Sequence, residues 1–366
     1  MEDLNREKIF DVAVIGAGPA GTSAAITAAR EGFAVALLES RTFPRHKVCG
    51  EFISGEALPI LRSLIANEEL LDHAPRIETA RVFLDDRIVT LAVEPAAASL
   101  SRYALDQSLW EAAIAEGVCV RDRVRVTAVH RNESAFSISS ERARIHARAV
   151  INASGRWSNL SRINGLHGNS SIGLKQHFHE GSSSLSCDLY FFPGGYCGVQ
   201  ALGNGTTNVA AMVRTDVARS LPEVFAQNRH LVARARSWQP AGEAVATSPL
   251  TFGPPRTSDA GTALAGDAAA FIDPFAGDGI SMALHSGRLA ALSLAPYLRG
   301  ESSLEAVLRN YDRGYKDLLQ PALKTAARLR LLLRLPKTLR LTALSLLQWA
   351  PLGRLAVRQT RVRMVA

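Results

Sequence analysis

The feature that most constrains the fold is a glycine-rich turn between a short apolar segment and an alanine-rich segment. Residues 8–15 are apolar and predict a buried strand, residues 16–21 read GAGPAG, and residues 22–30 predict a helix. Residues 33–38 predict a second strand, which ends at Glu39. A strand, helix and strand in this order form a βαβ unit, which requires a parallel sheet covered by helices. The sequence therefore predicts an α/β fold.

The glycines of this turn have the spacing G-x-G-x-x-G, which is typical of dinucleotide-binding folds. Gly16 allows the tight turn, Gly18 lets the backbone approach a pyrophosphate, and Gly21 allows the helix to pack closely. The amino end of the helix favours the negative charge of the phosphates. Glu39 lies where its carboxylate can accept both hydroxyls of an adenosine ribose. These residues predict a dinucleotide site, and both FAD and NAD use such a turn.

A second motif favours FAD. Residues 263–269 read ALAGDAA and are followed by Pro274 and by GDGI at residues 277–280. This pattern resembles the second FAD fingerprint of the flavoprotein superfamily that contains p-hydroxybenzoate hydroxylase, geranylgeranyl reductases and flavin-dependent halogenases. The resemblance implies that Asp267 binds a ribityl hydroxyl and that N–H groups of residues 277–280 face flavin N1 and O2, where a helix dipole stabilises reduced flavin. The alternative for Asp267 is an ordinary helix N-cap.

Two further segments are similar to motifs of this superfamily. Residues 101–109 read SRYALDQSL and match a helix whose arginine, here Arg102, lies beside the FAD. Residues 151–158 read INASGRWS and resemble the A-D-G-x-x-S motif of the aromatic hydroxylases, with Ser154 in place of the aspartate. Because the resemblance links that aspartate to NAD(P)H handling, its replacement weakens the expectation that NAD(P)H reduces the flavin directly. The A-S-G form is closer to the reductases and halogenases.

The motifs and the resemblance define one set of predicted cofactor residues. The predicted cofactor is FAD, and NAD(P)H or an external electron donor is the reductant. The predicted FAD-binding residues are Gly16, Gly18, Pro19, Ala20, Gly21, Glu39, Ser40, Arg45, Cys49, Gly50, Arg102, Gly155, Gly266, Asp267, Pro274, Gly277, Gly279 and Ile280.

The predicted catalytic residues are Cys49, Tyr190 and Phe192. Residues 44–51 read PRHKVCGE, similar to a geranylgeranyl reductase loop with Cys-Gly-Glu or Cys-Gly-Gly beside the isoalloxazine, which implies that Cys49 lines the reaction chamber. Residues 190–196 read YFFPGGY and resemble the Y-x-W-x-F-P segment of those reductases, which implies an aromatic wall above the flavin. The alternatives are a small buried thiol and core packing of the two rings. The sequence lacks the halogenase W-x-W-x-I-P motif, so halogenation is not expected.

His177 and His179 lie two residues apart on a predicted strand and so share one face. Such a pair can act in catalysis or bind a metal. The favoured interpretation is a pair of hydrogen-bonded sheet residues, because the sequence indicates no third ligand. No metal is predicted.

Three functions stay open. The first is a reductase that transfers hydride from FAD to a C=C bond of a hydrophobic lipid-like, polyketide or isoprenoid substrate. The second is a monooxygenase that hydroxylates an aromatic or quinol ring through a C4a-hydroperoxide in a dry pocket. The third is a non-catalytic or partner-dependent electron-transfer protein, which needs a redox partner. The Cys-Gly-Glu loop and the A-S-G motif favour the reductase.

The net charge of +8 is unevenly distributed. Residues 318–366 contain ten Lys and Arg and no Asp or Glu, so the body of the protein is slightly acidic. A nucleic-acid partner is therefore excluded for the body. The four cysteines show no C-x-x-C spacing, which predicts reduced thiols and a cytoplasmic location. The longest apolar segment, 341–352, contains polar residues and is shorter than the about 20 residues of a spanning helix.

The basic tail, residues 318–366, predicts helices with a stripe formed by Arg330, Arg334 and Lys337. One hypothesis is that the tail binds an anionic membrane, so that the protein is peripheral at its inner face and close to a lipid-soluble substrate. The alternative is that its helices pack on the body or on a second copy.

The predicted architecture is α/β, with an α+β substrate region. It combines a Rossmann-like FAD-binding domain, an inserted β-sheet substrate domain and a C-terminal helical region. The predicted boundaries are residues 1–75, 100–165 and 255–298 for the FAD domain, 76–99 and 166–254 for the substrate domain, and 299–366 for the helical region.

Overall fold

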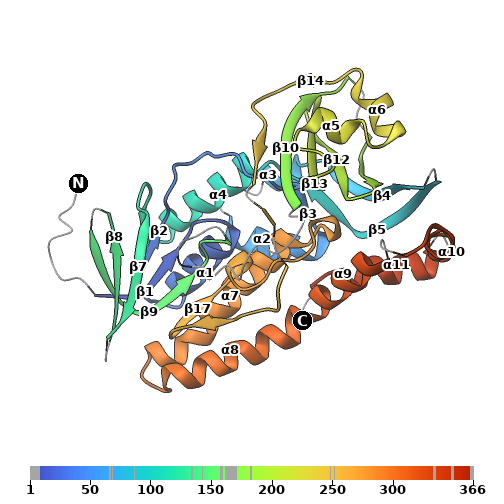
Figure 1. Ribbon diagram of the computed structural model, residues 1–366. Coiled ribbons are helices and arrows are strands. Elements are labelled where there is room, and N and C mark those ends of the chain that lie inside the picture. Colours follow the sequence, from blue (N-terminus) through green and yellow to red (C-terminus); the bar gives the residue numbers. More distant parts are fainter. Residues whose placement is uncertain are drawn as a thin grey trace.

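The computed structural model contains two β-sheets that lie side by side and a helical tail that runs along both (Figure 1). It describes residues 9–362 apart from 66, 68, 86, 133, 134, 142, 157–159, 161–170, 182, 183, 248, 251, 333, 334, 348 and 349.

The first sheet contains the predicted βαβ unit. Its strand order is β16, β17, β9, β1, β2, β6, and the strands from β17 to β6 are parallel. A β7–β8 hairpin extends it antiparallel to β9. The strands are β1 (Ile9–Ile15), β2 (Val35–Leu38), β6 (Cys119–Arg121), β7 (Val126–Arg131), β8 (Phe136–Ser140), β9 (Arg144–Asn152), β16 (Ser258–Asp259) and β17 (Thr262–Leu264).

Helices cover this sheet, and small residues let them approach one another. Helix α1 (Pro19–Arg30) packs on β1 and β2 and makes its most extensive contact with α7 (Gly279–Leu298). A Cβ at Gly287 of α7 would lie 2.0 Å from the carbonyl oxygen of Ala20, so only glycine allows this contact. The hydroxyl of Ser23 donates to the carbonyl of Leu284 across the same contact, at 2.7 Å. The pairing of α1 with α7 brings the two predicted FAD motifs together.

Further helical segments precede α7 in the chain. They are η1 (Gly55–Ala57), α2 (Leu58–Leu64), α3 (Glu69–Asp72), α4 (Arg102–Ala115), η2 (Gly266–Ala268) and η3 (Pro274–Ala276).

The second sheet is largely antiparallel, and only the β11–β4 pair among its described strands is parallel. Its order is β14, β10, β13, β12, β11, β4, β5, β3, and β15 also pairs with β10. The strands are β3 (Phe52–Ile53), β4 (Arg76–Leu84), β5 (Arg87–Ser99), β10 (Ser171–His179), β11 (Ser186–Phe192), β12 (Gly195–Gly203), β13 (Thr206–Arg214), β14 (Gln239–Pro240) and β15 (Val245–Ala246).

The two faces of the second sheet have different neighbours. One face packs against α5 (Leu221–Phe225) and α6 (Arg229–Ala235), and Phe83, Phe178 and Trp238 belong to that core. The opposite face meets the loop at residues 45–51 and the first sheet's helices. Because side chains alternate along a strand, the sequence register decides which residues can reach a site between the sheets.

The tail packs on the body in four helices, seen as the orange and red segments of Figure 1. The guanidinium of Arg340 pairs with both carboxylate oxygens of Asp85, at 2.5 and 2.6 Å. Leu341 packs against an apolar cluster that contains Val89 of β5 and Tyr196 of β12. The helices are α8 (Leu304–Leu318), α9 (Gln320–Leu332), α10 (Lys337–Leu347) and α11 (Ala350–Gln359). Among the described residues, no helix is long and apolar enough to span a membrane.

The predicted fold class is confirmed, and the differences are local. The helix of the glycine turn begins at Pro19 rather than residue 22, because proline is well suited to the first turn of a helix. The strand expected at 87–93 continues to Ser99. Residues 52–53, assigned to the FAD domain, pair with β5 of the second sheet. The domain boundaries stay predictions.

Candidate functional site

The glycine turn has the shape that the sequence predicts for a phosphate cradle. Gly16 has a φ of +96°, and a Cβ there would lie 2.5 Å from the carbonyl oxygen of Ala153. A Cβ at Gly21 would lie only 1.7 Å from the carbonyl oxygen of Gly16. Gly18 is different, because a Cβ there would meet no described protein atom within 4 Å. Gly16 and Gly21 are thus required by the fold, whereas the open space at Gly18 suits a ligand.

Glu39 lies at the end of β2 with its carboxylate 4% exposed. It accepts the backbone N–H of Ala17 at 2.9 Å, and the Arg45 guanidinium binds both of its oxygens at 2.8 and 3.0 Å. Burial alone would raise the pKa of Glu39, but Arg45 and the Ala17 N–H outweigh burial and hold this pKa below its ordinary value. The neighbouring hydroxyl of Ser40 donates to the carboxylate at 3.2 Å. Glu39, Ser40 and Arg45 are therefore brought together beside the turn.

The second motif meets the first at the amino end of α1. Gly266 has a φ of +61°, and a Cβ there would lie 2.8 Å from the Cβ of Ala20. The side chain of Asp267 is exposed beside this contact and is free to face a ligand. Gly155, from the A-S-G motif, has a φ of +78° and lies after β9. Residues 157–159 of that motif lie outside the described residues.

The segment 273–281 contains a buried carboxylate and a buried hydroxyl group. The hydroxyl of Ser281 has no hydrogen bond among the described residues. The carboxylate of Asp273 faces the backbone of Phe275 and the guanidinium of Arg330. Burial raises the pKa of Asp273 to about 6, although Arg330 lies 3.6 Å away. Pro274 begins η3, and Gly277 ends it in the left-handed conformation with a φ of +69°. Gly279 and Ile280 then start α7.

These observations fit FAD. The open cradle at Gly18, the buried carboxylate of Glu39 and the exposed Asp267 match its pyrophosphate, ribose and ribityl groups in chemistry. The unpartnered hydroxyl of Ser281 lies at the amino end of a 20-residue helix, where an electron-rich ring edge is stabilised.

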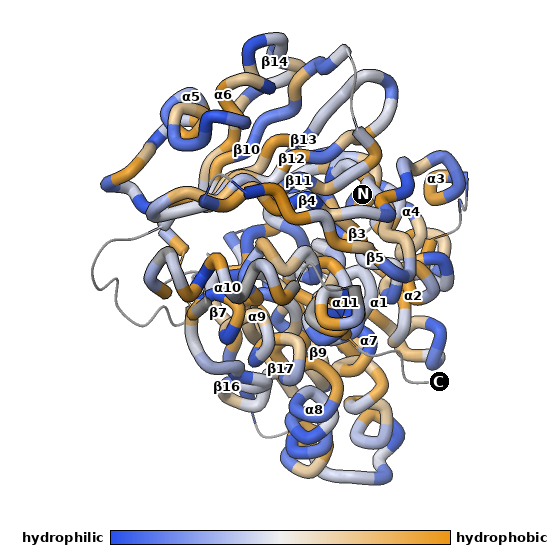
Figure 2. Tube along the Cα trace, turned by 90° about the vertical axis from the view of Figure 1, so that its right-hand side faces the viewer, coloured by the Kyte–Doolittle hydropathy of each residue, from blue (hydrophilic) through white to orange (hydrophobic). Residues whose placement is uncertain are grey.

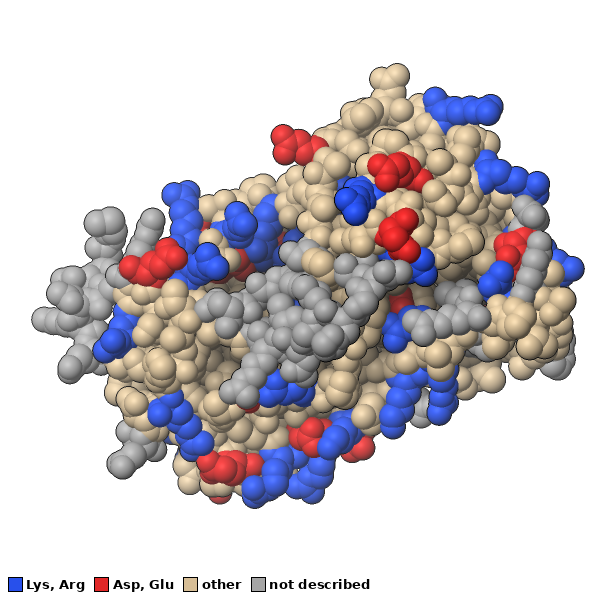
Figure 3. Space-filling view, in the orientation of Figure 1, with Lys and Arg blue, Asp and Glu red and all other residues tan. Residues whose placement is uncertain are grey.

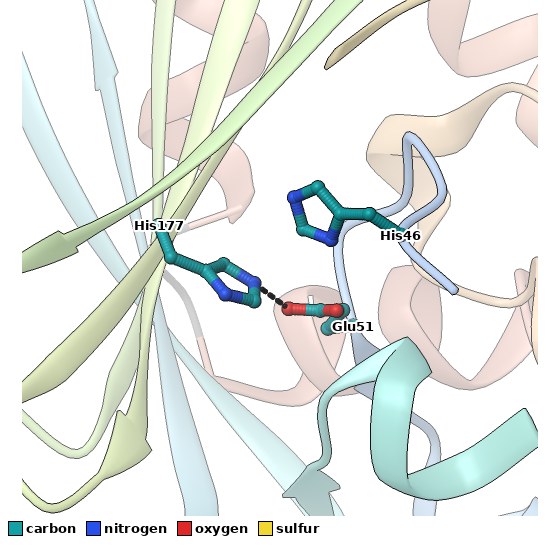
Figure 4. A group of neighbouring side chains, drawn as sticks. All are labelled: His46, Glu51 and His177. Carbon is teal, nitrogen blue, oxygen red and sulfur yellow. Dashed lines mark hydrogen bonds and ion pairs between the residues drawn. The ribbon is translucent and has the colours of Figure 1, made fainter. Parts of the chain in front are cut away.

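Glu51 is the centre of a buried charged cluster between the two sheets (Figure 4). Its carboxylate accepts the Lys175 ammonium at 2.5 Å, the His177 Nε2 at 2.7 Å and the backbone N–H of Arg102 at 2.6 Å. Lys175 and His177 lie two apart on β10. Figure 4 shows His177 extending from the second sheet towards Glu51, whereas His46 comes from the loop on the opposite side. The His46 ring lies 4.7 Å from that of His177, edge to face.

The cluster is electrostatically balanced around one ionised carboxylate. Burial alone would raise the pKa of Glu51, but the hydrogen bonds and charges of His177 and Lys175 hold it below its ordinary value. Burial lowers the pKa of Lys175 from its ordinary value, although Glu51 opposes this change. Burial and the nearby Lys175 and His177 lower the pKa of His46 to about 4, so its ring is neutral at pH 7. The cluster therefore holds protons on Lys175 and His177 close to one acceptor.

Ligand-type atoms of His46, Glu51 and His177 lie within 4.8 Å of one another, as in a metal site. However, both Glu51 oxygens already accept hydrogen bonds, and the Lys175 ammonium would repel a cation. His179, the other histidine considered from the sequence, is exposed at the end of β10. The cluster is better suited to protons than to a metal ion.

A cavity of about 530 Å³ opens on the side of this cluster, and His177 and Tyr103 are part of its wall. The Tyr103 ring stacks on His46 at 4.9 Å. Ser99, Leu202 and Thr206 line the same cavity. His177 thus connects the buried Glu51 with an accessible space.

Cys49 lies next to the cluster and is partly buried. Its sulfur accepts the backbone N–H of Glu51 at 3.3 Å, and its interactions with Arg102 and Lys175 place two cations around it. The side-chain amide of Asn208 donates to the carbonyls of Cys49 at 3.1 Å and Gly50 at 2.8 Å. The Cys49 loop is therefore fixed to β13 of the second sheet.

Arg102 starts α4 and is buried, with its guanidinium on both oxygens of Asp106 at 2.8 and 2.7 Å. The predicted Arg102, Cys49 and Gly50 are thus neighbours in the structure. The sequence analysis missed Lys175. Its signal is a lysine two residues before His177 on a strand, where Leu174 and Phe178 alternate on the other face.

Tyr190 and Phe192 are placed differently from the sequence expectation. Both point to the α5–α6 side of the second sheet, where Tyr190 stacks on Phe83 at 4.3 Å and its hydroxyl accepts from Arg234 at 3.3 Å. The intervening Phe191 points to the other side. Because side chains alternate along a strand, this register places Tyr190 and Phe192 on the α5–α6 face and Phe191 on the opposite face; the aromatic wall stays a prediction that this register does not favour.

On the opposite face of the second sheet, Phe191, Tyr196 and Phe275 form an aromatic cluster. Phe191 lies 5.6 Å from Tyr196 and 6.1 Å from Phe275, measured between ring centroids. Phe275 belongs to η3 of the second FAD motif. Leu84 and Leu341 extend this cluster, so a tail residue contributes to an apolar surface beside the predicted flavin position.

The chain was compared with known proteins. A family model described as pyridine nucleotide-disulphide oxidoreductase matches residues 10–201, more than half of the chain. Among curated relatives, conditioned medium factor receptor 1 of Dictyostelium discoideum is 28% identical and covers 84% of this chain and 67% of the relative. Menaquinone reductase of Mycobacterium tuberculosis is 28% identical over 95% of this chain and 90% of the relative. Digeranylgeranylglycerophospholipid reductase 1 of Methanococcoides burtonii is 27% identical over 84% and 79%.

Solved structures show the same fold. A flavin-dependent brominase superimposes with a TM-score of 0.80 and 20% identity, covering 96% of this chain and 93% of that one. The myxobacterial chondrochloren halogenase, a variant of the FAD-dependent halogenases, superimposes with a TM-score of 0.73 and 23% identity, covering 84% and 79%. Sequence and fold agree with the chemistry of the glycine cradle and Glu39: the chain belongs to the family of FAD-dependent oxidoreductases that contains the halogenases, geranylgeranyl reductases and menaquinone reductases.

Proposed function

We propose that this protein is an FAD-dependent reductase that saturates a C=C bond in an isoprenoid chain carried by a lipid or quinone. Two of the relatives above are named for the reduction of menaquinone and of a digeranylgeranyl phospholipid. The observation that carries the proposal is the Lys175–Glu51–His177 cluster directly behind Cys49. Saturation of a C=C bond adds one hydride and one proton. This cluster holds protons at the point where the loop of residues 45–51 reaches the predicted flavin position.

FAD supplies the hydride when it is bound and reduced. The chain's own residues position the reactants and hold the proton. Lys175 is fully buried, and its lowered pKa makes its ammonium a better proton donor than an exposed lysine. Glu51 links it to His177, whose ring reaches the cavity wall, so a proton that leaves Lys175 can be replaced from solvent.

The apolar cluster supports a long hydrophobic substrate. Phe191, Tyr196 and Leu84 are buried, and Phe275 and Leu341 pack against them partly buried. An apolar cluster beside the reacting carbons excludes water and is compatible with an isoprenoid chain, which has no polar group to pair.

The tail supports the delivery of such a substrate from an anionic membrane. Leu331, Leu339, Leu346 and Leu355 of α9, α10 and α11 are between 50% and 59% exposed. The three helices lie close together and alternate hydrophilic and hydrophobic residues (Figure 2). Lys and Arg side chains lie along the lower edge of the face in Figure 3, over α8 and α9, with Asp and Glu side chains among them. Of the predicted basic stripe, Arg334 lies outside the described residues, and Arg330 points inwards to Asp273.

The proposed reaction and the proposed location at a membrane are tested separately. For the reaction, full-length holoprotein reduced without oxygen is mixed with menaquinone or a geranylgeranyl phospholipid, and the products are separated by mass spectrometry. Loss of one C=C bond with reoxidation of an equivalent amount of flavin supports the proposal. Flavin that reacts only with oxygen and yields a hydroxylated ring would refute it. Flavin reduction by NAD(P)H, compared with reduction by a ferredoxin, identifies the electron donor.

For the location, Leu339→Glu combined with Leu346→Glu should lower co-sedimentation with phosphatidylglycerol vesicles, because both leucines are exposed and would have to enter the lipid interface. The matched control is Leu185→Glu, at an exposed leucine of the second sheet's edge outside the tail. Equal binding of both variants and of the unaltered protein would reject the tail as the membrane-binding element.

A further inference from the structure

Residues 360–362 leave the surface helix α11 and become buried beside the predicted FAD position. Arg358 and Gln359 are exposed at the end of that helix, but Thr360, Arg361 and Val362 are 5%, 9% and 0% exposed. An arginine is rarely buried without a specific partner. The burial of Arg361 therefore needs an explanation in terms of what it contacts.

The contacts of Arg361 are with the turn that precedes α7. Its guanidinium donates to the carbonyl of Ala276 at 2.7 Å and lies 3.8 Å from the carboxylate of Asp278. It also lies over the Phe52 ring, 5.1 Å from the centroid. The next residue, Val362, donates its backbone N–H to the other carboxylate oxygen of Asp278 at 2.9 Å. Two consecutive tail residues thus hold one turn of the FAD motif.

Asp278 occupies the N-cap of α7 without capping it. An N-cap aspartate usually accepts backbone N–H groups of the first helical turn, and the Asp278 side chain makes no such bond. It is fully buried and accepts instead the Ser54 hydroxyl at 2.7 Å and the Val362 N–H. Ser54 and Val362 draw the carboxylate away from the helix, so its first-turn N–H groups stay available to a ligand.

A second observation indicates that a ligand uses this helix end. The Ser281 hydroxyl, in the same first turn, is buried at 1% exposure and has no hydrogen bond among the described residues. Buried hydroxyl groups are normally paired, so an unpaired one at a helix amino end points to a missing acceptor. The family to which the chain belongs binds FAD, so the flavin is the candidate for this acceptor.

We propose that Arg361 is a positioning residue of the FAD site: together with the Val362 N–H it holds the turn 276–278 so that Asp278 leaves the amino end of α7 open to the flavin. The tail thereby becomes part of the cofactor site. The charged groups around Arg361 are Asp278 and Glu56, and burial raises the pKa of Asp278 to about 6. This inference rests on FAD binding alone and is independent of the reaction proposed above.

The test uses full-length holoprotein with Arg361→Ala and the matched control Arg358→Ala, three residues earlier and exposed. FAD release is followed by its fluorescence on dilution, and the flavin midpoint potential is measured by dye equilibration. We expect Arg361→Ala to weaken FAD binding by about tenfold, the effect of one charge-assisted hydrogen bond. It should also lower the midpoint potential, because a positive charge near the reduced ring is lost. Arg358→Ala should change neither quantity.

Two further variants separate positioning from general stability. Arg361→Lys keeps the charge and should restore most of the midpoint potential. Ser54→Ala removes one hydrogen bond from the buried Asp278 and should weaken FAD binding in the same direction. Because this loss also lowers the thermal midpoint of the apoprotein, FAD affinity is compared at a temperature at which the apoprotein of each variant is folded. Unchanged FAD affinity and potential in Arg361→Ala would overturn the proposal, as would equal losses in Arg361→Ala and Arg358→Ala.

Discussion

Replacement of Lys175 by methionine is the sharpest single test of the charged cluster. The change removes the ammonium that lies 2.5 Å from Glu51 but keeps an unbranched apolar side chain of similar length. Glu51 would then be a buried carboxylate with His177 and the backbone N–H of Arg102 as its remaining partners. In the unaltered protein, burial, Lys175 and His177 lower the pKa of His46 to about 4; in the variant, burial, the largest of these causes, still opposes a charge on His46.

The size of the stability loss in Lys175→Met follows from the burial of Lys175 and Glu51, because both side chains are 0% exposed. Loss of one partner from a buried ion pair costs about 3–5 kcal/mol of unfolding free energy. By comparison, the exposed pair of Lys316 and Asp312 has the same 2.5 Å separation, and its loss should cost no more than about 1 kcal/mol. Lys316→Met is therefore the matched control.

The direction in which the free energy of unfolding changes with pH follows from the pKa of Glu51. In the unaltered protein the pKa of Glu51 is lowered, so its stabilising effect is present above the ordinary value of 4.5 and is lost as the pH falls through the lower folded value. In Lys175→Met the pKa of Glu51 should rise because burial is no longer compensated. Each unit of rise corresponds to about 1.4 kcal/mol, which protonation at lower pH recovers. The stability gap between the variant and the unaltered protein should therefore narrow from pH 7 to pH 5.

Urea unfolding at both pH values measures this gap, and the double variant Glu51→Gln with Lys175→Met completes a thermodynamic cycle. The double variant should lose clearly less than the sum of the two single changes, because it leaves no unpaired charge. A loss in Lys175→Met that is independent of pH, or strict additivity in the cycle, would refute the account of the cluster.

Two other predictions concern the cofactor cradle and the aromatic residues. Gly21→Ala should prevent FAD incorporation and destabilise the apoprotein, because its Cβ would lie 1.7 Å from the Gly16 carbonyl oxygen. Gly18→Ala should leave the apoprotein's thermal midpoint unchanged and weaken FAD binding measured by fluorescence, and a normal FAD affinity would show that the pyrophosphate lies elsewhere. Tyr190→Phe should keep full turnover, whereas Phe191→Leu should raise KM for the hydrophobic substrate. The reverse result would show that the substrate contacts the face of Tyr190 and Phe192 instead.

The sequence predicts the FAD part of the fold well because its signals are local. Gly21 contacts Gly16, and Glu39 accepts the Ala17 N–H, all within one βαβ unit, and the spacing of the glycines indicates this turn directly. The contact of Gly16 with Ala153, outside the unit, has no such local signal. The second motif meets the first through the contact of Gly287 with Ala20, which a sequence pattern alone does not reveal.

The rest of the site depends on which strand faces meet. Tyr190 and Phe192 were predicted for the FAD side, and the β11 register places them on the α5–α6 face, with Phe191 on the opposite face. Lys175 meets Glu51 across 124 positions of the sequence, and Val362 meets Asp278 across 84. Such long-range pairs carry no local pattern. The same holds for the tail, whose charge is visible in the sequence although its contact with Asp278 is not.

The most direct test of the central claim is the origin of the atoms that the substrate gains. Reduced holoprotein is allowed one turnover with a geranylgeranyl lipid in deuterium oxide without oxygen, and a parallel sample in ordinary water receives isotopically labelled dioxygen. The account predicts a product with deuterium on both carbons of the former double bond in the first sample, and no labelled oxygen in the product of the second. Incorporation of labelled oxygen into the product, with the double bonds intact, would contradict it.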